Sequence, residues 1–409
     1  MPEPDRDDAA PPPGNGFDRV LALLIAGQIG MHAAMAGLRM AAPLQALREG
    51  HSAWSVGVLL ALFAAAPVLL ALGAGRMADR HGYHRPVRIA VGLSLAGLAV
   101  ALASTPLAGS AQFALLCVAA TLSGAGSNVG LIVMQRTASV RARDGVERVR
   151  MFSWIGMAPS LANVVGPVAA GLAIDLGGFA AAYALLLALP LGSAWCARRV
   201  PAQPPAAGPA ARGRGGAFAL LATPGFKRLL FVNWLLSSCW DVHSFAVPVL
   251  GNALGFNAST IGLILGLFTL AVTGVRLLIP LLAHRLREVT VVRAAMLATA
   301  AVFAAYPLTT SPWAMAGCAV LLGIALGAAQ PMLMSTLHRL TPAHRHGEAI
   351  ALRSMSINAA STLMPLAFGA AGAALGVATL FWVMGAAVGA GNWSARGLGA
   401  PAPDRSAAA

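Results

Sequence analysis

An internal repeat constrains this chain more than any other feature: residues 53–88 recur without a gap at 258–293. The two segments share Gly, Phe and Arg residues in one register, with an offset of 205 positions (Ala53 to Ala258). Such matches are hard to obtain by chance in an apolar chain. The repeat predicts two related halves, each containing a pair of apolar spans around a basic loop. The identical pairs are Pro43 and Pro248, Gly50 and Gly255, Ala53 and Ala258, Gly57 and Gly262, Leu60 and Leu265, Leu62 and Leu267, Phe63 and Phe268, Ala78 and Ala283, Arg80 and Arg285, and Arg88 and Arg293.

Composition indicates that most of the surface faces lipid. Charged residues make up 10% of the chain and apolar residues 58%, and the mean hydropathy is +0.73. Soluble domains carry about 25% charged residues, so a soluble protein of this size would lack the polar surface to cover itself. The net charge of +14 does not indicate a nucleic-acid partner, because the arginines fall between apolar runs rather than on one basic stripe.

Apolar segments of about 20 residues, long enough to cross a bilayer core, follow one another along the chain. We expect an all-α membrane protein with twelve transmembrane helices in two pseudo-symmetric six-helix bundles, an arrangement typical of transporters with a central site. The predicted spans are 19–42, 54–75, 87–106, 111–135, 152–174, 179–197, 226–249, 260–282, 290–309, 313–337, 349–371 and 374–394. The predicted divisions are a disordered tail at 1–16, bundles at 17–198 and 226–395, a flexible linker at 199–225 and a tail at 396–409.

The distribution of arginine predicts the orientation in the membrane. Loops after the even-numbered spans are rich in arginine, whereas Arg48 is essentially the only arginine on the opposite side. We therefore expect the linker and both termini on the cytoplasmic side of the inner (plasma) membrane. The N-terminus is acidic and Pro-rich, so no cleavable signal peptide is expected.

The loop after the second predicted span, residues 75–85, reads GRMADRHGYHR. It resembles the signature of the major facilitator superfamily, which is a Gly, three residues, Asp-Arg, one residue, Gly and then basic residues. Gly75 is expected to let two helices approach, Gly82 to permit a tight turn, and Asp79 to accept hydrogen bonds from arginine or a helix N-terminus. The resemblance implies a cytoplasmic latch that favours the outward-facing state; a loop that only sets topology is the alternative. The matching residues are Gly75, Asp79, Arg80, Gly82 and Arg85.

The fifth predicted span carries a second resemblance, to the Gly-Pro-x-x-Gly-Gly element of proton-coupled exporters in this superfamily. Gly166, Pro167 and Gly171 match it, Ala170 replaces the first closing Gly, and Gly156 lies earlier in the span. Pro removes a helix hydrogen bond and Gly permits close packing, so this element could bend and slide. A packing face of small residues would use the same residues.

The fourth predicted span departs from the drug exporters of the superfamily. Ala120 and Ser123 stand where the Arg and Gln of their proton relay are expected. A standard multidrug mechanism is therefore in doubt. Spans four and ten also match each other, because Gly124 precedes Arg136, and Gly327 precedes Arg339, by twelve residues.

Charged residues near the predicted cytoplasmic ends complete the expected latch. They could instead be interface anchors, since Arg snorkels readily there. These residues are Arg136, Arg339, Glu348 and Arg353.

Asp241 is the only carboxylate well inside a predicted span. A carboxylate in lipid costs several kcal/mol unless it is paired, solvated or protonated. We predict that Asp241 is the main proton-binding group, with His32 and His243 as further candidates. His243 is two residues on and points to a different helix face, so only one of the two should face the cavity. The structural alternative pairs Asp241 with Arg276, although they lie about 22 and 9 Å from the cytoplasmic ends of their spans.

Other polar residues inside spans are candidates for lining the same cavity. Gln28 maps onto Asn233 through the repeat, whereas Arg276 has no counterpart because Ala71 stands there. His32 lies mid-depth between Gln28 and Arg39, and a packing histidine is the alternative for it. The predicted cavity residues are Gln28, His32, Arg39, Asn128, Asn163, Asn233, Trp240, Asp241 and Arg276.

These features predict a secondary active transporter that moves a small organic solute by alternating access. We expect proton-coupled export, with proton-coupled uptake of a small organic acid or metabolite as the alternative. A cavity lined by Asp241 would favour cationic cargo, whereas Arg39, Arg276 and His32 would favour anionic cargo, and the sequence does not choose.

Other classes are less compatible with the sequence. The only lysine, Lys227, follows no Gly-rich phosphate loop, which excludes an ATP-driven pump. A membrane-embedded enzyme or a non-transporting sensor remains as a remote alternative. We expect the partners to be the solute, protons and the lipid bilayer, with no nucleic acid, no cofactor, no metal site and no catalytic residues, and we expect a monomer.

Overall fold

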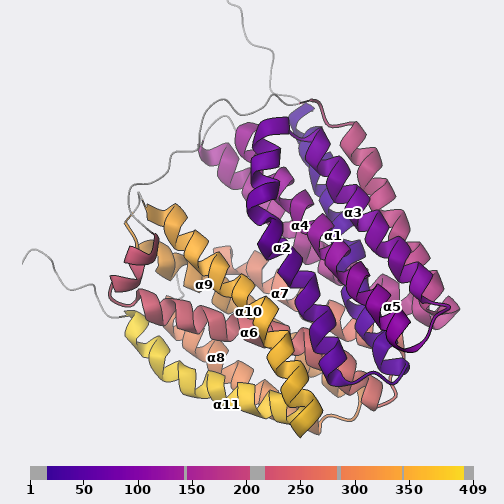
Figure 1. Ribbon diagram of the computed structural model, residues 1–409. Helices are drawn as coiled ribbons and strands as arrows, with labels where there is room; N and C mark the ends of the chain where they lie inside the picture. Colours follow the sequence, from indigo (N-terminus) through magenta and orange to yellow (C-terminus); the bar gives the residue numbers. More distant parts are fainter. Residues whose placement is uncertain (1–15, 142–144, 203–216, 283–286, 343–344, 400–409) are drawn as a thin grey trace, which may run out of the picture.

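The computed structural model describes residues 16–141, 145–202, 217–282, 287–342 and 345–399, and within these ranges it is helical without strands (Figure 1). Only helices satisfy every backbone polar group inside a single apolar segment. The α-helices are α1 (Gly16–Arg48), α2 (Ala53–His81), α3 (His84–Ser104), α4 (Gly109–Arg141), α5 (Gly145–Arg198), α6 (Phe226–Ala253), α7 (Ala258–Leu282), α8 (Glu288–Ala305), α9 (Pro312–Leu340), α10 (His346–Leu375) and α11 (Val377–Arg396). Short 3-10 helices are η1 (Ala217–Ala222), η3 (Tyr306–Leu308) and η5 (Gly397–Gly399).

Helix α5 contains the fifth and sixth predicted spans. Its backbone leaves the helical conformation at Gly177 and Gly178, with φ of 76° at Gly178. That positive φ suits glycine because it has no Cβ. Gly376, 198 positions later, has φ of 83° between α10 and α11. A glycine with positive φ therefore lies at the junction of the last two helices in each half of the chain.

Nine described segments are long and apolar enough to cross a membrane. The number is below the predicted twelve for two reasons. The segment Met157–Arg198 holds two predicted spans, and neither α6 nor α11 is among the nine. Helix α6 carries Asn233, Asp241 and His243 among its apolar residues. These polar residues make α6 a candidate for a solute site, and they also lower its mean hydropathy.

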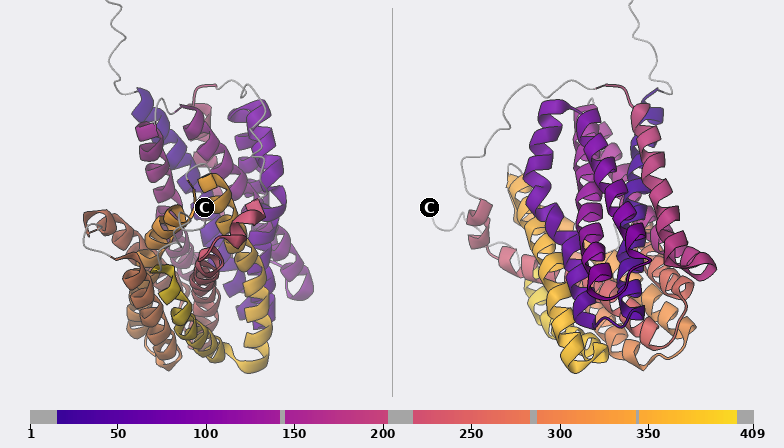
Figure 2. Two further views of the ribbon diagram at one scale, coloured as in Figure 1. Left: turned by 90° about the vertical axis from the view of Figure 1, so that its left-hand side faces the viewer. Right: turned by 45° about the vertical axis from the view of Figure 1, so that its right-hand side comes forward.

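The helices pack in two groups that follow the two halves of the chain (Figures 1 and 2). In the N-terminal half, α1 packs on α5 and α4 packs on α2 and α3. In the C-terminal half, α9 packs on α7 and α8, while α11 packs on α6 and α8. The main contacts between the halves are α5 with α7 and α2 with α10. We call these two contacts the seams.

The repeat seen in the sequence recurs in the backbone. Gly50 and Gly255 both have positive φ, 85° and 73°. The residue after each of these glycines donates its backbone N–H to the carbonyl oxygen five residues earlier. His51 donates to Ala46 and Phe256 donates to Gly251, both at 2.9 Å. The two turns lie at one end of the molecule, which we call the far side; the opposite end, where α1 and α6 begin, is the terminal side (Figure 2).

The seams are built alike. A Cβ at Gly57 of α2 would collide with the carbonyl oxygen of Pro365 in α10, and a Cβ at Gly262 of α7 would collide with that of Pro167 in α5. Glycine is therefore required sterically at two positions that the 205-residue repeat relates. The repeated glycine in the sequence predicted equivalent positions, and both backbones use it in the same way.

The predicted match between spans four and ten is wrong by one helical turn. The counterpart of Gly124 is Gly323 rather than Gly327. A Cβ at Gly124 would strike the carbonyl of Phe63, and a Cβ at Gly323 would strike that of Phe268. Gly323 and Gly327 are one turn apart on the same face of α9, and the sequence offers no means of choosing between them.

Parts of the predicted linker and tail are structured. Helix η1, inside the predicted linker 199–225, packs on α6 and α10 and buries Leu220. Helix η5, inside the predicted tail 396–409, buries Leu398. The predicted disordered tail at 1–16 lies outside the described residues except for its last residue, the first of α1.

Candidate functional site

A cavity of about 290 Å³ lies among α1, α6, α7, α9 and α10. It combines charged, polar and apolar side chains, as small-molecule sites do. Trp240 and Arg39 separate it from a smaller cavity of about 40 Å³ toward α5. The larger cavity is lined by Arg39, Leu236, Ser237, Trp240, Asp241, Arg276, Leu326, Gln330, Ile357 and Ser361.

Asp241 faces this cavity and pairs with Arg39 from the other half of the chain. Their closest atoms, Arg39 Nη2 and Asp241 Oδ1, are 3.6 Å apart, and the Asp241 side chain is only 4% exposed. Ser361 Oγ of α10 donates a hydrogen bond to Asp241 Oδ2 at 3.2 Å. The alternative pairing considered for Asp241, with Arg276, is therefore not the one that the structure contains. This result agrees with the difference in depth expected between Asp241 and Arg276, about 22 against 9 Å from the cytoplasmic ends of their spans.

Arg276 lines the cavity from α7, nearer the terminal side. Arg353 of α10 reaches the same cavity wall, because its guanidinium bonds to Gln330, which also lines the cavity. Arg353 donates from Nε to Asn233 Oδ1 at 2.9 Å and from Nη2 to Gln330 Oε1. Arg353, predicted as a latch residue, thus lies within the C-terminal half at the cavity wall. Gln330 was not predicted, although an amide within an apolar span was the available signal.

Three other predicted polar residues of the N-terminal half, Gln28, His32 and Asn163, form a network with Ser127 of α4. His32 Nδ1 lies 3.0 Å from Ser127 Oγ, and its Nε2 lies 3.4 Å from Asn163 Nδ2. Gln28 donates to the carbonyl of Ser127 at 3.3 Å. Asn163 also lines the smaller cavity. His32 on α1 is therefore hydrogen-bonded to residues of its own half and does not contact Asp241 on α6 in any described hydrogen bond.

Asn128 and His243 lie away from the larger cavity. Asn128 donates to the carbonyl of Pro67 at 3.4 Å. His243 is buried against Phe268, with ring centroids 4.2 Å apart, and its Nδ1 is 3.4 Å from the hydroxyl of Tyr306. Asp241 and His243 point to different surroundings, as expected for residues two positions apart on a helix.

The loop predicted as the latch is described only in part. Gly82 ends α2 with φ of 66°, a positive value that glycine adopts readily. A Cβ at Gly75 would meet nothing within 4 Å, so no helix packs closely against Gly75 in this structure. The side chain of Asp79 lies outside the described residues, while Arg80 and Arg85 are exposed.

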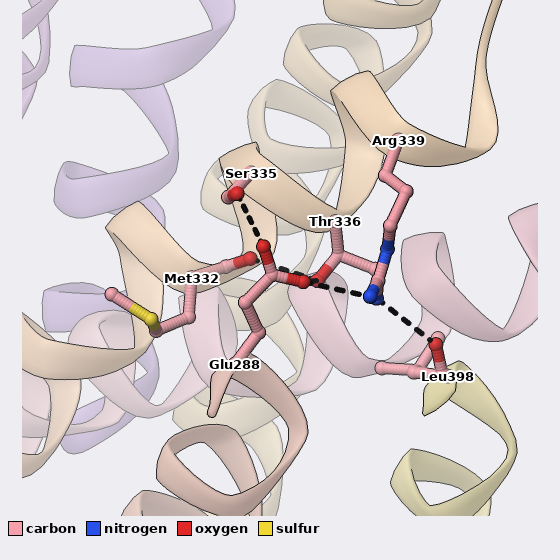
Figure 3. A network of polar contacts seen from close by, with 6 residues as sticks. All are labelled: Glu288, Met332, Ser335, Thr336, Arg339 and Leu398. Carbon is pink, nitrogen blue, oxygen red and sulfur yellow. Dashed lines mark hydrogen bonds and ion pairs between the residues drawn. The ribbon is translucent and has the colours of Figure 1, made fainter. Parts of the chain in front are cut away.

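Arg339 and Glu348 were also predicted for the latch. Each forms an ion pair with another residue of the C-terminal half. Figure 3 shows Glu288, at the start of α8, holding Ser335, Thr336 and Arg339 of α9. Arg339 Nη2 lies 2.9 Å from Glu288 Oε2 and donates to the carbonyl of Leu398 at 3.4 Å. Glu348 pairs with Arg345 at 2.6 Å. Arg136 is half-buried at the corresponding end of α4.

Glu288→Gln should lower the stability of the α8–α9 contact. The substitution removes the ion pair with Arg339 and weakens the hydrogen bonds that Ser335 and Thr336 donate to Glu288. Because Arg339 is 53% exposed, the expected loss in the free energy of unfolding is only about 1 kcal/mol. The thermal unfolding midpoint of the purified protein, compared with Glu49→Gln as an exposed control, measures this. An unchanged midpoint would show that the network contributes nothing to stability.

The Gly-Pro element of α5 lies at a seam. A Cβ at Gly166 would strike the carbonyl of Ala33 in α1, and one at Gly171 would strike that of Ala258 in α7. The carbonyl of Pro167 faces Gly262. These residues thus pack α5 against both halves of the chain. Gly156 lies outside the described side chains.

Asp175, near the end of the first part of α5, makes a contact that the sequence did not predict. Its Oδ1 accepts from the N–H of Ala258 at 3.0 Å and its Oδ2 from the N–H of Ser259 at 2.8 Å. Asn257 accepts from Thr260 at the same helix start. A carboxylate of one half thus caps α7 of the other half, where the helix dipole favours negative charge. Asp175 directly follows the predicted span 152–174, so it was not marked as a charge within an apolar segment.

Asp175→Ala should loosen the far side. An exposed carboxylate at a helix N-terminus contributes about 1 kcal/mol, so its loss would favour opening of the α5–α7 contact about fivefold. Labelling of Ala258→Cys by an impermeant maleimide, in a background with the four native cysteines replaced, should then accelerate. Ala258 is fully buried, and Glu49→Gln is the matched acidic control. Equal labelling rates would contradict a closing role.

A family model described as Major Facilitator Superfamily matches residues 24–236 and 229–406. A curated relative, the tetracycline resistance protein, class B, of Escherichia coli, is 34% identical over 120 residues. That match spans 29% of this chain and 28% of the relative.

Solved transporter structures have the same fold at low sequence identity. A bacterial homologue of the iron transporter ferroportin, in an inward-facing state, has a TM-score of 0.73 at 16% identity, covering 94% of this chain and 100% of its own. The nucleoside transporter NupG has 0.72 at 14%, covering 93% and 100%. A POT family transporter in complex with 5-aminolevulinic acid has 0.70 at 13%, covering 91% and 94%.

Proposed function

The chain belongs to the Major Facilitator Superfamily, and on that premise we propose that it is a proton-coupled secondary active transporter of a small organic solute. The observation that carries the proposal is the Arg39–Asp241 ion pair, which joins the two halves inside a solute-sized cavity. Twelve spans in two pseudo-symmetric bundles, with both termini in the cytoplasm of an inner-membrane protein, belong to the same proposal. The repeated seams and the placement of arginine support it.

The conformation that we propose for this structure is inward-facing. The seam glycines and the Asp175 cap close the far side, and the halves diverge toward the terminal side in Figure 2. A structurally similar transporter is itself in an inward-facing state. Alternating access would then open the seams and close the terminal side, where residues 75–85 would act as the latch.

Protons would act through the pair at the cavity. A protonated Asp241 loses its charge and releases Arg39, whereas an ionised Asp241 holds Arg39 across the interface at 3.6 Å. The contact between the halves thus differs between the two protonation states. A differential contact of this kind is what allows a ligand to shift a conformational equilibrium.

Export by proton antiport is the first candidate direction. It is supported by the Gly-Pro element at the seam and by the partial similarity to a tetracycline resistance protein. In this direction a solute would compete with the proton for Asp241, which suits a cationic or amphipathic solute.

Uptake by symport is the second candidate, and the cavity charge favours it. Two arginines line the cavity with one carboxylate, and Arg353 lies at its wall. Proton binding to Asp241 would free Arg39 and make the cavity more positive. A proton and an anionic solute would therefore bind cooperatively.

Reconstituted vesicles with an imposed pH gradient test the function. Radiolabelled solutes from cationic, neutral and anionic classes should include at least one that accumulates only when the gradient is present. Its direction relative to proton flow separates antiport from symport. Absence of gradient-driven movement across all three classes, in protein that is folded, would reject proton-coupled transport.

A further inference from the structure

We propose that Arg276 and Arg353 form the binding site for an acidic group, a carboxylate or a phosphate, on the transported solute. This deepens the proposed function and rests on it. Arg276 of α7 lines the cavity, and Arg353 of α10 donates a hydrogen bond to Gln330, another residue that lines it.

The charge balance of the cavity carries the proposal. Among the described residues, Asp241 is the carboxylate on this cavity, and it is already paired with Arg39. The described ion pairs elsewhere join Arg339 to Glu288 and Arg345 to Glu348, and none includes Arg276 or Arg353. Two half-buried guanidiniums at the same cavity therefore have no carboxylate partner among the described ion pairs. Unneutralised charge within a membrane protein is costly, and a bound anion would offset that cost.

The orientation of Arg353 is fixed by neutral groups. Asn233 accepts from Nε at 2.9 Å and Gln330 accepts from Nη2. Both partners are amides, so they hold the guanidinium without cancelling its charge. Gln330 itself lines the cavity, which places this guanidinium at the cavity wall. Guanidinium groups held in this way suit the planar, two-oxygen edge of a carboxylate or phosphate.

The rest of the cavity suits the body of the same solute. Asn233 and Asp241 are eight residues apart on α6, about 12 Å at 1.5 Å per residue, so the acidic group and the proton site would lie at two depths. Leu236 and Trp240 lie between these two levels on α6 and line the cavity. Trp240 is held edge-on against Phe268, with ring centroids 4.6 Å apart. The predicted solute is therefore a small organic acid with an apolar or aromatic body.

An acidic solute at this site has a consequence for direction. Protonation of Asp241 would release Arg39 into a cavity that already holds Arg276, so a proton would promote anion binding. The site thus favours symport, the second candidate above, over exchange of solute for proton.

Binding of simple aromatic probes tests the site directly. Benzoate, phenyl phosphate, benzamide and benzylammonium would be titrated against the purified full-length protein in lipid nanodiscs, with the thermal unfolding midpoint as the readout. Benzoate or phenyl phosphate should raise the midpoint saturably, while benzamide and benzylammonium should not. The relative effect of the two anions distinguishes a carboxylate site from a phosphate site.

Matched variants locate the effect. Arg276→Gln and Arg353→Gln should each weaken anion binding roughly 10- to 100-fold, because each removes a charge-assisted contact. Arg287→Gln, an exposed arginine of the same half, should bind like the parent. Arg276→Lys and Arg353→Lys keep the charge and serve if a Gln variant does not fold; they should bind anions more weakly than the parent because the guanidinium fork is lost.

Two results would overturn the proposal: equal stabilisation by benzoate and benzamide, or anion binding that none of the cavity variants weakens. If vesicles still moved a solute under a pH gradient, the proposed transport function would be retained and only the anion site would be rejected. Conversely, anion binding without any gradient-driven transport would retain the site and reject the function.

Discussion

Asp241→Asn should abolish proton-driven accumulation, lowering it at least about tenfold, while solute binding and exchange without a gradient persist in part. The amide cannot change its charge between the two sides of the membrane, so proton binding can no longer alter the contact with Arg39. Ser361 can still donate to the Asn oxygen, which preserves local packing. The measurement is accumulation in vesicles with and without an imposed pH gradient.

Two further variants separate coupling from folding. Removing one partner of a buried ion pair costs about 3–5 kcal/mol, so the single variant could lose stability through an uncompensated Arg39. The double variant Asp241→Asn with Arg39→Gln should recover stability without recovering coupling. Asp241→Glu should retain partial coupling with a shifted pH optimum. Accumulation at the parent level in Asp241→Asn would make Asp241 structural and turn attention to His32.

Gly57→Ala and Gly262→Ala should each reduce transport at least about tenfold in folded protein. In both cases a methyl group would overlap a backbone carbonyl, that of Pro365 or Pro167, and backbone cannot move aside as a flexible side chain can. The far side could then no longer close fully, and the cycle would stop in one state. Transport rates and maleimide labelling of Ala258→Cys report the two consequences.

Gly73→Ala is the matched control for these substitutions. Gly73 belongs to the same helix as Gly57, and a Cβ there would meet nothing within 4 Å. Alanine also favours helix over glycine by about 1 kcal/mol, so this variant should transport at the parent rate. If Gly57→Ala behaved like Gly73→Ala, the close approach of α2 to α10 would have no role in transport.

The sequence predicted the fold better than it predicted the site. Gly50, Gly57 and their partners 205 positions later were visible as a repeat, because turns and close contacts demand glycine itself. Asp241 and Arg276 were predicted for the cavity, and both line it, because charge within an apolar span is conspicuous.

Pairing between helices was harder to predict. Arg39 was expected at the cavity but not as the partner of Asp241, and Arg353 was assigned to the cytoplasmic latch by depth alone. Helices that are apolar on all faces carry little information about their rotation, so the sequence does not say which side chains meet. The same limit explains the one-turn error at Gly327 and the missed contact of Asp175 with α7.

The composition of the seams bears on how such a chain can diversify. Each seam brings a glycine against main-chain oxygen, an atom that every amino acid supplies. Substitutions at Leu236, Ile357 or other cavity positions can therefore change what is recognised without changing the surfaces that open and close. A chain built in this way can acquire a new cargo by a few cavity substitutions while its moving parts are inherited unaltered.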